Sequence, residues 1–181
     1  MMIIDKYFQL EKYGLQIRLV NEEDAEYIVS LRTDLRLGKF LNSTKNDVEN
    51  QKKWIRDYKR REEIGLDYYF IYLHKGQRIG VNRIYNIHGK TATSGSWICS
   101  NDLPYELPLL TVMIVREIFF DVLGLEIDLF DIRKNNKKVI KMHLLLGSHH
   151  IYENEIDVFH YITKNDYIIN KAKFLKYLDL N

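Results

Sequence analysis

Three consecutive strand-like stretches, separated only by short turns, constrain the fold of this chain most. Residues 68–73, 77–86 and 93–99 are rich in the β-branched and aromatic side chains that favour strands. The segments between them, 74–76 and 88–90, are too short for crossover helices. The three strands are therefore predicted to pair antiparallel, which excludes a doubly wound parallel fold.

Hydrophobic periodicity and turn residues predict the remaining elements on both sides of these strands. Before them we expect a strand at 16–20 and helices at 22–33 and 46–63. After them we expect helices at 104–122, 135–146 and 164–178, and strands at 126–132, 150–153 and 156–163.

The size and composition of the chain fit one domain. Its 181 residues, of which 46% are hydrophobic, are enough for one core, and two prolines and nine glycines leave little material for a linker. We predict a single α+β domain over residues 1–181, with its core at about 13–163 and a C-terminal helix at about 164–178. The sheet is predicted to be mixed and mostly antiparallel, with about six to seven strands flanked by helices.

The charge balance and the cysteine count bear on partners and location. A net charge of +2 gives no reason to expect nucleic acid as a partner. Cys99 is the only cysteine, which excludes an internal disulfide and a multi-cysteine metal site. The N-terminal segment lacks the apolar stretch of a signal peptide, and no window approaches the roughly 20 apolar residues of a membrane span. We expect a cytoplasmic monomer or homodimer without a metal and without a membrane partner.

Four sequence blocks carry a resemblance to one known superfamily. Residues 17–32 read IRLVxxxDAxxIxxLR, 79–87 read IGxxRxYxI, 94–98 read SGxWI and 136–147 read NxxVxxxHxxxG. In this order they resemble the GNAT superfamily of acyl-CoA-dependent N-acyltransferases, and the first block resembles its ribosomal-protein branch. Four segments are similar to members associated with bacterial surface-polysaccharide and flagellin-sugar pathways: YF at 69–70, RIYNI at 83–87, GSW at 95–97 and DxRKxNKKV at 131–139.

The resemblance implies an N-acetyltransferase that moves an acetyl group from acetyl-CoA to a primary amine. The predicted acceptor is a small molecule, an amino sugar that is nucleotide-linked in the favoured case, in surface-polysaccharide biosynthesis. One alternative is the N-terminal amine of a ribosomal or other protein. Another is a non-catalytic GNAT-like binding domain whose coenzyme loop is degenerate.

Coenzyme-binding residues are implied by the same resemblance. In the superfamily, the thioester and the pantetheine arm lie along the strand before the main helix, where backbone amides hold them. The corresponding strand end here is Trp97, Ile98, Cys99 and Ser100.

The loop before the main helix departs from the superfamily pattern. Where the superfamily has glutamine or arginine, then glycine, then glycine or alanine, this chain has Leu103, Glu106 and Pro108. Pro108 has no amide hydrogen to offer, and Glu106 brings negative charge toward a pyrophosphate. We expect either that this coenzyme site has decayed or that the loop takes another course and offers other amides, those of Tyr105, Leu107 or Leu109.

His143 is the predicted catalytic residue. It stands seven residues after Asn136 and four before Gly147, where the superfamily often has the tyrosine that protonates the departing thiolate. A histidine has an ordinary pKa of ~6.5 and can exchange a proton near neutrality. The alternative is a partly exposed histidine on an amphipathic helix. Asn136 is expected to hold the strands or the pantetheine arm, and it can also cap a helix.

The acceptor cleft implied by the resemblance lies between the first two helices and the central hairpin. Arg83 and Tyr85 share one strand face by alternation, so the arginine could hold a phosphate or carboxylate, or form a cross-strand pair on a solvated face. No carboxylate stands out as the general base, and a water chain is an alternative. The candidate acceptor-binding residues are Arg32, Phe40, Arg83, Tyr85 and Ser96.

Overall fold

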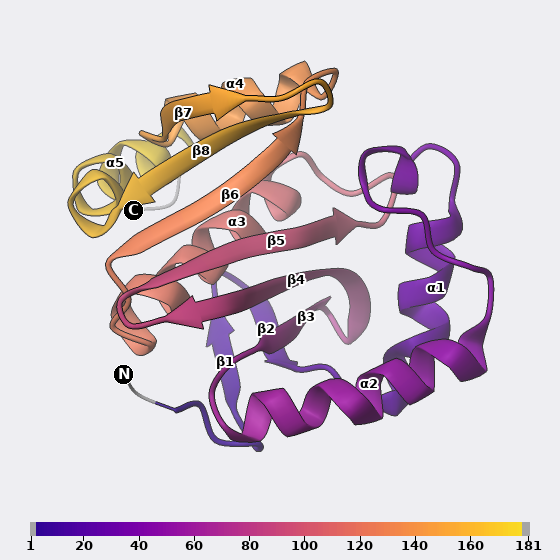
Figure 1. The fold of residues 1–181 in the computed structure, drawn as a ribbon. Coiled ribbons are helices and arrows are strands. Elements are labelled where there is room, and N and C mark those ends of the chain that lie inside the picture. Colours follow the sequence, from indigo (N-terminus) through magenta and orange to yellow (C-terminus); the bar gives the residue numbers. More distant parts are fainter. Residues whose placement is uncertain (1–2, 179–181) are drawn as a thin grey trace.

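One mixed sheet of eight strands forms the centre of the computed structural model, which describes residues 3–178 (Figure 1). The strand order across the sheet is β1-β2-β3-β4-β5-β6-β8-β7. Among the described strands, β5 and β6 alone pair in parallel. The strands are β1 (Gln9–Lys12), β2 (Leu15–Leu19), β3 (Tyr68–His74), β4 (Gln77–His88), β5 (Thr91–Cys99), β6 (Ile127–Arg133), β7 (His149–Glu153) and β8 (Asp157–Thr163).

Five α-helices and three short turns of helix complete the chain between residues 3 and 178. None of these helices is both long and apolar enough to cross a bilayer. The elements are η1 (Glu22–Asp24), α1 (Ala25–Thr33), η2 (Gly38–Phe40), α2 (Val48–Glu63), α3 (Glu106–Glu117), the π-helical turn η3 (Ile118–Val122), α4 (Lys137–Leu145) and α5 (Lys164–Tyr177).

The predicted α+β fold and antiparallel meander are confirmed, but the predicted number of strands was too low. The additional strand, β1, pairs with β2 through a two-residue turn in which Tyr13 and Gly14 both have positive φ angles of 54° and 72°. This turn geometry matches the natural twist of a hairpin. The β1 sequence was missed because its four residues are polar or half-exposed and carry little hydrophobic alternation.

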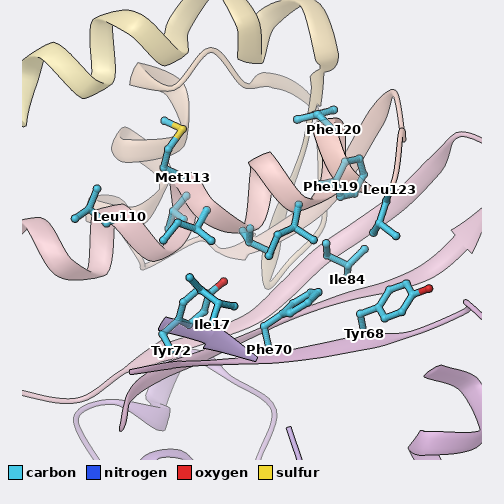
Figure 2. Close-up of a cluster of buried hydrophobic side chains, with 14 of the residues drawn as sticks. Ile17, Tyr68, Phe70, Tyr72, Ile84, Leu110, Met113, Phe119, Phe120 and Leu123 are labelled. Atoms are coloured by element: carbon cyan, nitrogen blue, oxygen red, sulfur yellow. The ribbon is translucent and has the colours of Figure 1, made fainter. Parts of the chain in front are cut away.

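Helices cover the two faces of the sheet unequally. On one face, α1 and α2 pack on β3–β5 through a cluster that includes Ile28 and Tyr58. On the other face, the long apolar helix α3 and its continuation η3 form the larger core. Figure 2 shows Leu110, Met113 and Phe119 from this helix above Phe70 and Tyr72 of the sheet.

The parallel pair β5–β6 is the point at which the sheet splits. Only Thr91 with Ile127 and Ala92 with Asp128 are in register, and beyond them the two strands diverge (Figure 1). The buried carboxylate of Asp128 ends the ladder, because it accepts hydrogen bonds from the Ser94 amide (2.8 Å) and the Ser94 hydroxyl (2.6 Å). The divergence leaves one edge of β5 without a strand partner.

Candidate active site

A cavity of about 400 Å³ occupies the region where β5 and β6 diverge. Its walls come from the α1–α2 loop, the ends of β4, β5 and β6, and one face each of α3 and α4. The side chains with polar groups in these walls are Arg32, Arg36, Asn42, Asn82, Tyr85, Ser94, Ser96, Trp97, Cys99, Arg116, Asp131, Arg133, Asn136, Lys138 and His143.

A β-bulge in β5 shapes the cavity wall. Ile98 pairs with Val81 and Gly95 pairs with Arg83, so two residues of β5 lie opposite one of β4. Ser96, within the bulge, has a positive φ of 53°. Bulges of this kind free backbone groups from the ladder and occur often beside active sites.

The backbone amides of β5 that were expected to hold the thioester point alternately toward β4 and toward the split between β5 and β6. The Ser100 amide donates to Ile79 on the β4 side (2.9 Å). Because successive strand amides point to opposite edges, the amides of Trp97 and Cys99 face the split, and that of Ile98 faces β4. The expectation is therefore wrong for Ser100, whose amide is already bonded, and for Ile98, whose amide points to β4, while the amides of Trp97 and Cys99 fit the role.

The loop before α3 has fewer free backbone amides for a pyrophosphate than expected. The Leu107 amide donates to the Pro104 carbonyl (3.1 Å), and Leu109, as the fourth residue of α3, lies where the helix's own hydrogen bonds begin. These two amides are thus taken within the protein. Tyr105 is exposed at the helix N-cap, where its amide has no such bond.

His143 lies on the α3 side of the cavity, against the ring of Phe130 (4.6 Å between centroids). Its Nδ1 is 2.8 Å from Arg116 Nη2. Because a guanidinium can only donate, Nδ1 is the acceptor and Nε2 carries the ring hydrogen. Burial lowers the pKa of His143 well below its ordinary value, and the Arg116 charge adds to this. The imidazole is therefore neutral at pH 7.

Two buried polar side chains in the cavity wall were not predicted from the sequence. Arg116 is 2% exposed, and burial lowers its pKa to about 10, opposed by the charge of Asp128. Asn82 is 3% exposed, and its Oδ1 has no hydrogen-bond partner among residues 3–178. A buried amide oxygen without a partner is costly, so Asn82 offers a ready acceptor to a ligand in the cavity.

Cys99 also lines the cavity, but burial raises the pKa of its thiol to about 11. The thiol therefore stays protonated near neutrality, which argues against a nucleophilic cysteine. Asn136 sits at the N-cap position of α4 without a side-chain capping bond, so its amide is available to the cavity.

Of the residues predicted to bind the acceptor, Arg32, Phe40, Tyr85 and Ser96 line the cavity and Arg83 does not. Arg83 shares a face with Tyr85 as predicted, with its guanidinium 4.7 Å from that ring. However, it is held in an ion pair with Asp67 (Nη2–Oδ2 2.5 Å). The prediction that Arg83 binds the acceptor is thus wrong, because its guanidinium is already paired with a buried carboxylate from the segment before β3.

The α1–α2 loop is tied to β6 across the cavity. Arg133 donates to the Asn42 side chain (2.8 Å) and pairs with Asp157 (2.9 Å). Arg32 donates to the Asn42 carbonyl (3.2 Å) and to Thr44 (2.6 Å). These contacts bring a loop and a strand that are 91 positions apart in the sequence to one site.

We expect the free energy of unfolding to fall as the pH is lowered from 7.5 to 5.5. The folded-state pKa values of His143 and His160 lie below that of an unfolded histidine, so the unfolded chain binds protons first as the pH drops below ~6.5. Below that pH the free energy of unfolding then falls by up to about 1.4 kcal/mol per pH unit for each histidine. Urea titrations at pH 7.5, 6.5 and 5.5 measure this, and an unchanged midpoint would refute it.

Searches for known proteins gave matches among solved structures alone: no protein-family model and no curated protein matches the chain. The structure of apo FdhC, a nucleotide-linked sugar GNAT, is 33% identical, with a TM-score of 0.85 over 95% of this chain and 99% of that chain.

Two less similar structures share the fold. The ribosomal-protein-S5-alanine acetyltransferase of Vibrio fischeri is 18% identical, with a TM-score of 0.73 over 88% of this chain and 98% of that chain. The spermidine N-acetyltransferase of Vibrio cholerae, in complex with CoA and spermine, is 13% identical, with a TM-score of 0.74 over 87% of this chain and 99% of that chain.

The split sheet, the bulged β5 and the near full-length match to a GNAT agree with one another and with the sequence resemblance. The chain belongs to the GNAT family and is an acyl-CoA-dependent N-acetyltransferase.

Proposed function

We propose that this enzyme acetylates the amine of a nucleotide-linked amino sugar with acetyl-CoA as the donor, in surface-polysaccharide biosynthesis. The observation that carries the proposal is the charge pattern of the cavity. Five cationic side chains and a single carboxylate, that of Asp131, are among the residues that line it. Such a site suits a substrate with one ammonium group and a multiply charged anionic group.

The similarity to FdhC, a nucleotide-linked sugar GNAT, supports this class of acceptor. Arg36 is a candidate to bind the pyrophosphate of the nucleotide, because its side chain is exposed at the cavity wall without an ion-pair partner among residues 3–178. Arg32 and Arg133 are held by Asn42 and stiffen the same side of the cavity.

On the donor side, the amides of Trp97 and Cys99 would hold the pantetheine arm and the thioester, with Asn136 and Asn82 as further partners. The Tyr105 amide would bind the pyrophosphate of the coenzyme at the start of α3, where the helix dipole favours an anion. His143 would face the sulfur. Because its imidazole is neutral, we propose that it stabilises the departing thiolate as an Nε2–H donor rather than as an imidazolium acid.

Calorimetry and an acceptor panel test this proposal. We expect acetyl-CoA to bind below millimolar concentration, and CoA release to be fastest with nucleoside-diphosphate-linked amino sugars. The corresponding free amino sugar should react at least about tenfold more slowly in kcat/KM, because charge-assisted hydrogen bonds contribute about 1.5–3 kcal/mol each. Arg36→Gln should lower kcat/KM for the nucleotide-linked sugar and leave the free sugar unaffected.

Other outcomes would favour the alternatives. Acetylation of peptide N-termini without acetylation of any amino sugar would assign the enzyme to protein N-terminal acetylation. No heat of binding with acetyl-CoA or CoA at millimolar concentration would indicate a GNAT-like binding domain with a degenerate coenzyme loop.

A further inference from the structure

Asp131 carries the one carboxylate among the described side chains that line the cavity. Alternation along β6 buries Phe130 and Ile132 under α3 and places Asp131 on the opposite face, toward the α1–α2 loop. Its nearest basic neighbour on the strand, Arg133, pairs with Asp157 instead. Among residues 3–178, no ion pair or side-chain hydrogen bond engages the Asp131 carboxylate.

The surroundings of Asp131 make the binding of a cation by its carboxylate favourable. Desolvation raises the pKa of Asp131, Asp157 raises it further, and Arg133 opposes the rise. The Asp131 charge in turn is the second cause, after burial, that raises the pKa of Tyr85, and both side chains line the cavity. The charged and titratable groups around Asp131 are Arg133 on β6, Asp157 on β8, Tyr85 on β4, and Arg32 and Arg36 beside the α1–α2 loop.

We infer that Asp131 binds the ammonium group of the acceptor and is the general base of acetyl transfer. This inference rests on the proposed acetyl transfer and adds the residue that receives the proton. Asp131 lies on the acceptor side of the split, whereas His143 lies on the α3 side with its Nδ1 occupied by Arg116. The two residues therefore flank opposite sides of the gap through which an acyl group must pass.

Acetyl transfer begins with deprotonation of the acceptor ammonium. The Asp131 carboxylate takes one proton from the ammonium, which leaves a neutral amine with a free electron pair. That pair forms the C–N bond to the thioester carbon, the C–S bond breaks, and its electron pair leaves with sulfur. The second nitrogen proton passes to sulfur to give the thiol, and Asp131 returns its proton to water. The net products are the amide, CoA and one proton.

The test compares Asp131→Asn with Asp57→Asn, which removes the same charge from an exposed site on α2 outside the cavity. With the acceptor that the wild type uses fastest, we expect kcat/KM of Asp131→Asn to fall at least about 100-fold at pH 7, within the range for loss of a general base. Acetyl-CoA affinity should stay within threefold of wild type. The deficit should narrow as the pH approaches the pKa of the amine, because free amine needs no base.

Each outcome decides a separate point. The inference is supported if kcat/KM of Asp131→Asn falls in a pH-dependent way, if Asp131→Glu recovers part of that loss, and if Asp57→Asn keeps the kcat/KM of the wild type. Rates within threefold of wild type at every pH overturn it, even though acetyl transfer itself is intact. If the wild type acetylates peptides instead of sugars and Asp131→Asn loses that activity, the base is supported while the acceptor class fails. A wild type that binds no acetyl-CoA overturns both proposals.

Discussion

Replacing Arg116 with methionine is expected to lower the free energy of unfolding at pH 7 by at least about 1–3 kcal/mol, because it removes the donor to His143 Nδ1 and the positive charge that acts on the buried Asp128. Arg116 is 2% exposed and Asp128 is fully buried, and the Arg116 charge opposes the burial-driven rise in the Asp128 pKa. Methionine fills a similar length without charge. The Asp128 carboxylate would keep its hydrogen bonds to Ser94 but lose the nearby positive charge.

Asp128→Asn provides the matched second change. By itself it leaves Arg116 as the uncompensated charge and should also destabilise the protein. Combined with Arg116→Met it removes both charges, so the double variant should be more stable than the sum of the single effects predicts, by about 0.5–3 kcal/mol. Urea unfolding followed by circular dichroism measures all four proteins. Additive effects within about 0.5 kcal/mol would show that the two charges do not stabilise each other.

His143→Phe is expected to lower kcat at least about tenfold while the affinity for acetyl-CoA stays near that of wild type, because phenylalanine keeps the ring but removes the Nε2–H donor. The change also removes the acceptor of the Arg116 hydrogen bond. A buried, unpaired donor on a charged group costs about 1–3 kcal/mol. Turnover should therefore be measured well below the unfolding temperature of the variant.

His143→Gln separates the two effects. A glutamine amide offers both an acceptor for Arg116 and an N–H donor, so stability should recover, and turnover should lie between those of the wild type and His143→Phe. Wild-type turnover in His143→Phe would assign this residue to packing. Equal turnover in both variants, at equal folded fractions, would show that the imidazole itself is needed.

Local signals in the sequence predicted the fold well. The short turns at 74–76 and 88–90 left no room for crossover helices, and the β3–β4–β5 meander is as expected. The Asn21 cap at the start of the first helical segment is also confirmed. The β1 hairpin was missed because a short, polar edge strand has no hydrophobic face to reveal it.

Most of the site residues that the resemblance implied lie in the cavity wall. Asn136 and His143 are among them, and the roles that the resemblance gives them stay predictions. Arg83 was misjudged because its partner, Asp67, is 16 positions away and no local pattern shows the pair. Arg116 did have a signal, a charge inside an apolar helix. Asp131 had none, since an aspartate on an exposed strand face looks the same whether it meets water or a substrate.

The unpaired edge of β5 has a consequence for how the protein avoids self-association. A free strand edge is a template on which other chains can add, and aggregation through such edges is a general hazard of sheets. Here the free edge of β5 faces the gap between β5 and β6. At one end of this gap the two strands pair, and the Asp128 side chain accepts the hydrogen bond of the Ser94 amide. The kink at Ser96 also removes the flat, regular spacing that a second polypeptide strand would need. The enzyme can thus keep its hydrogen-bonding groups open to a small ligand while denying them to a neighbouring chain.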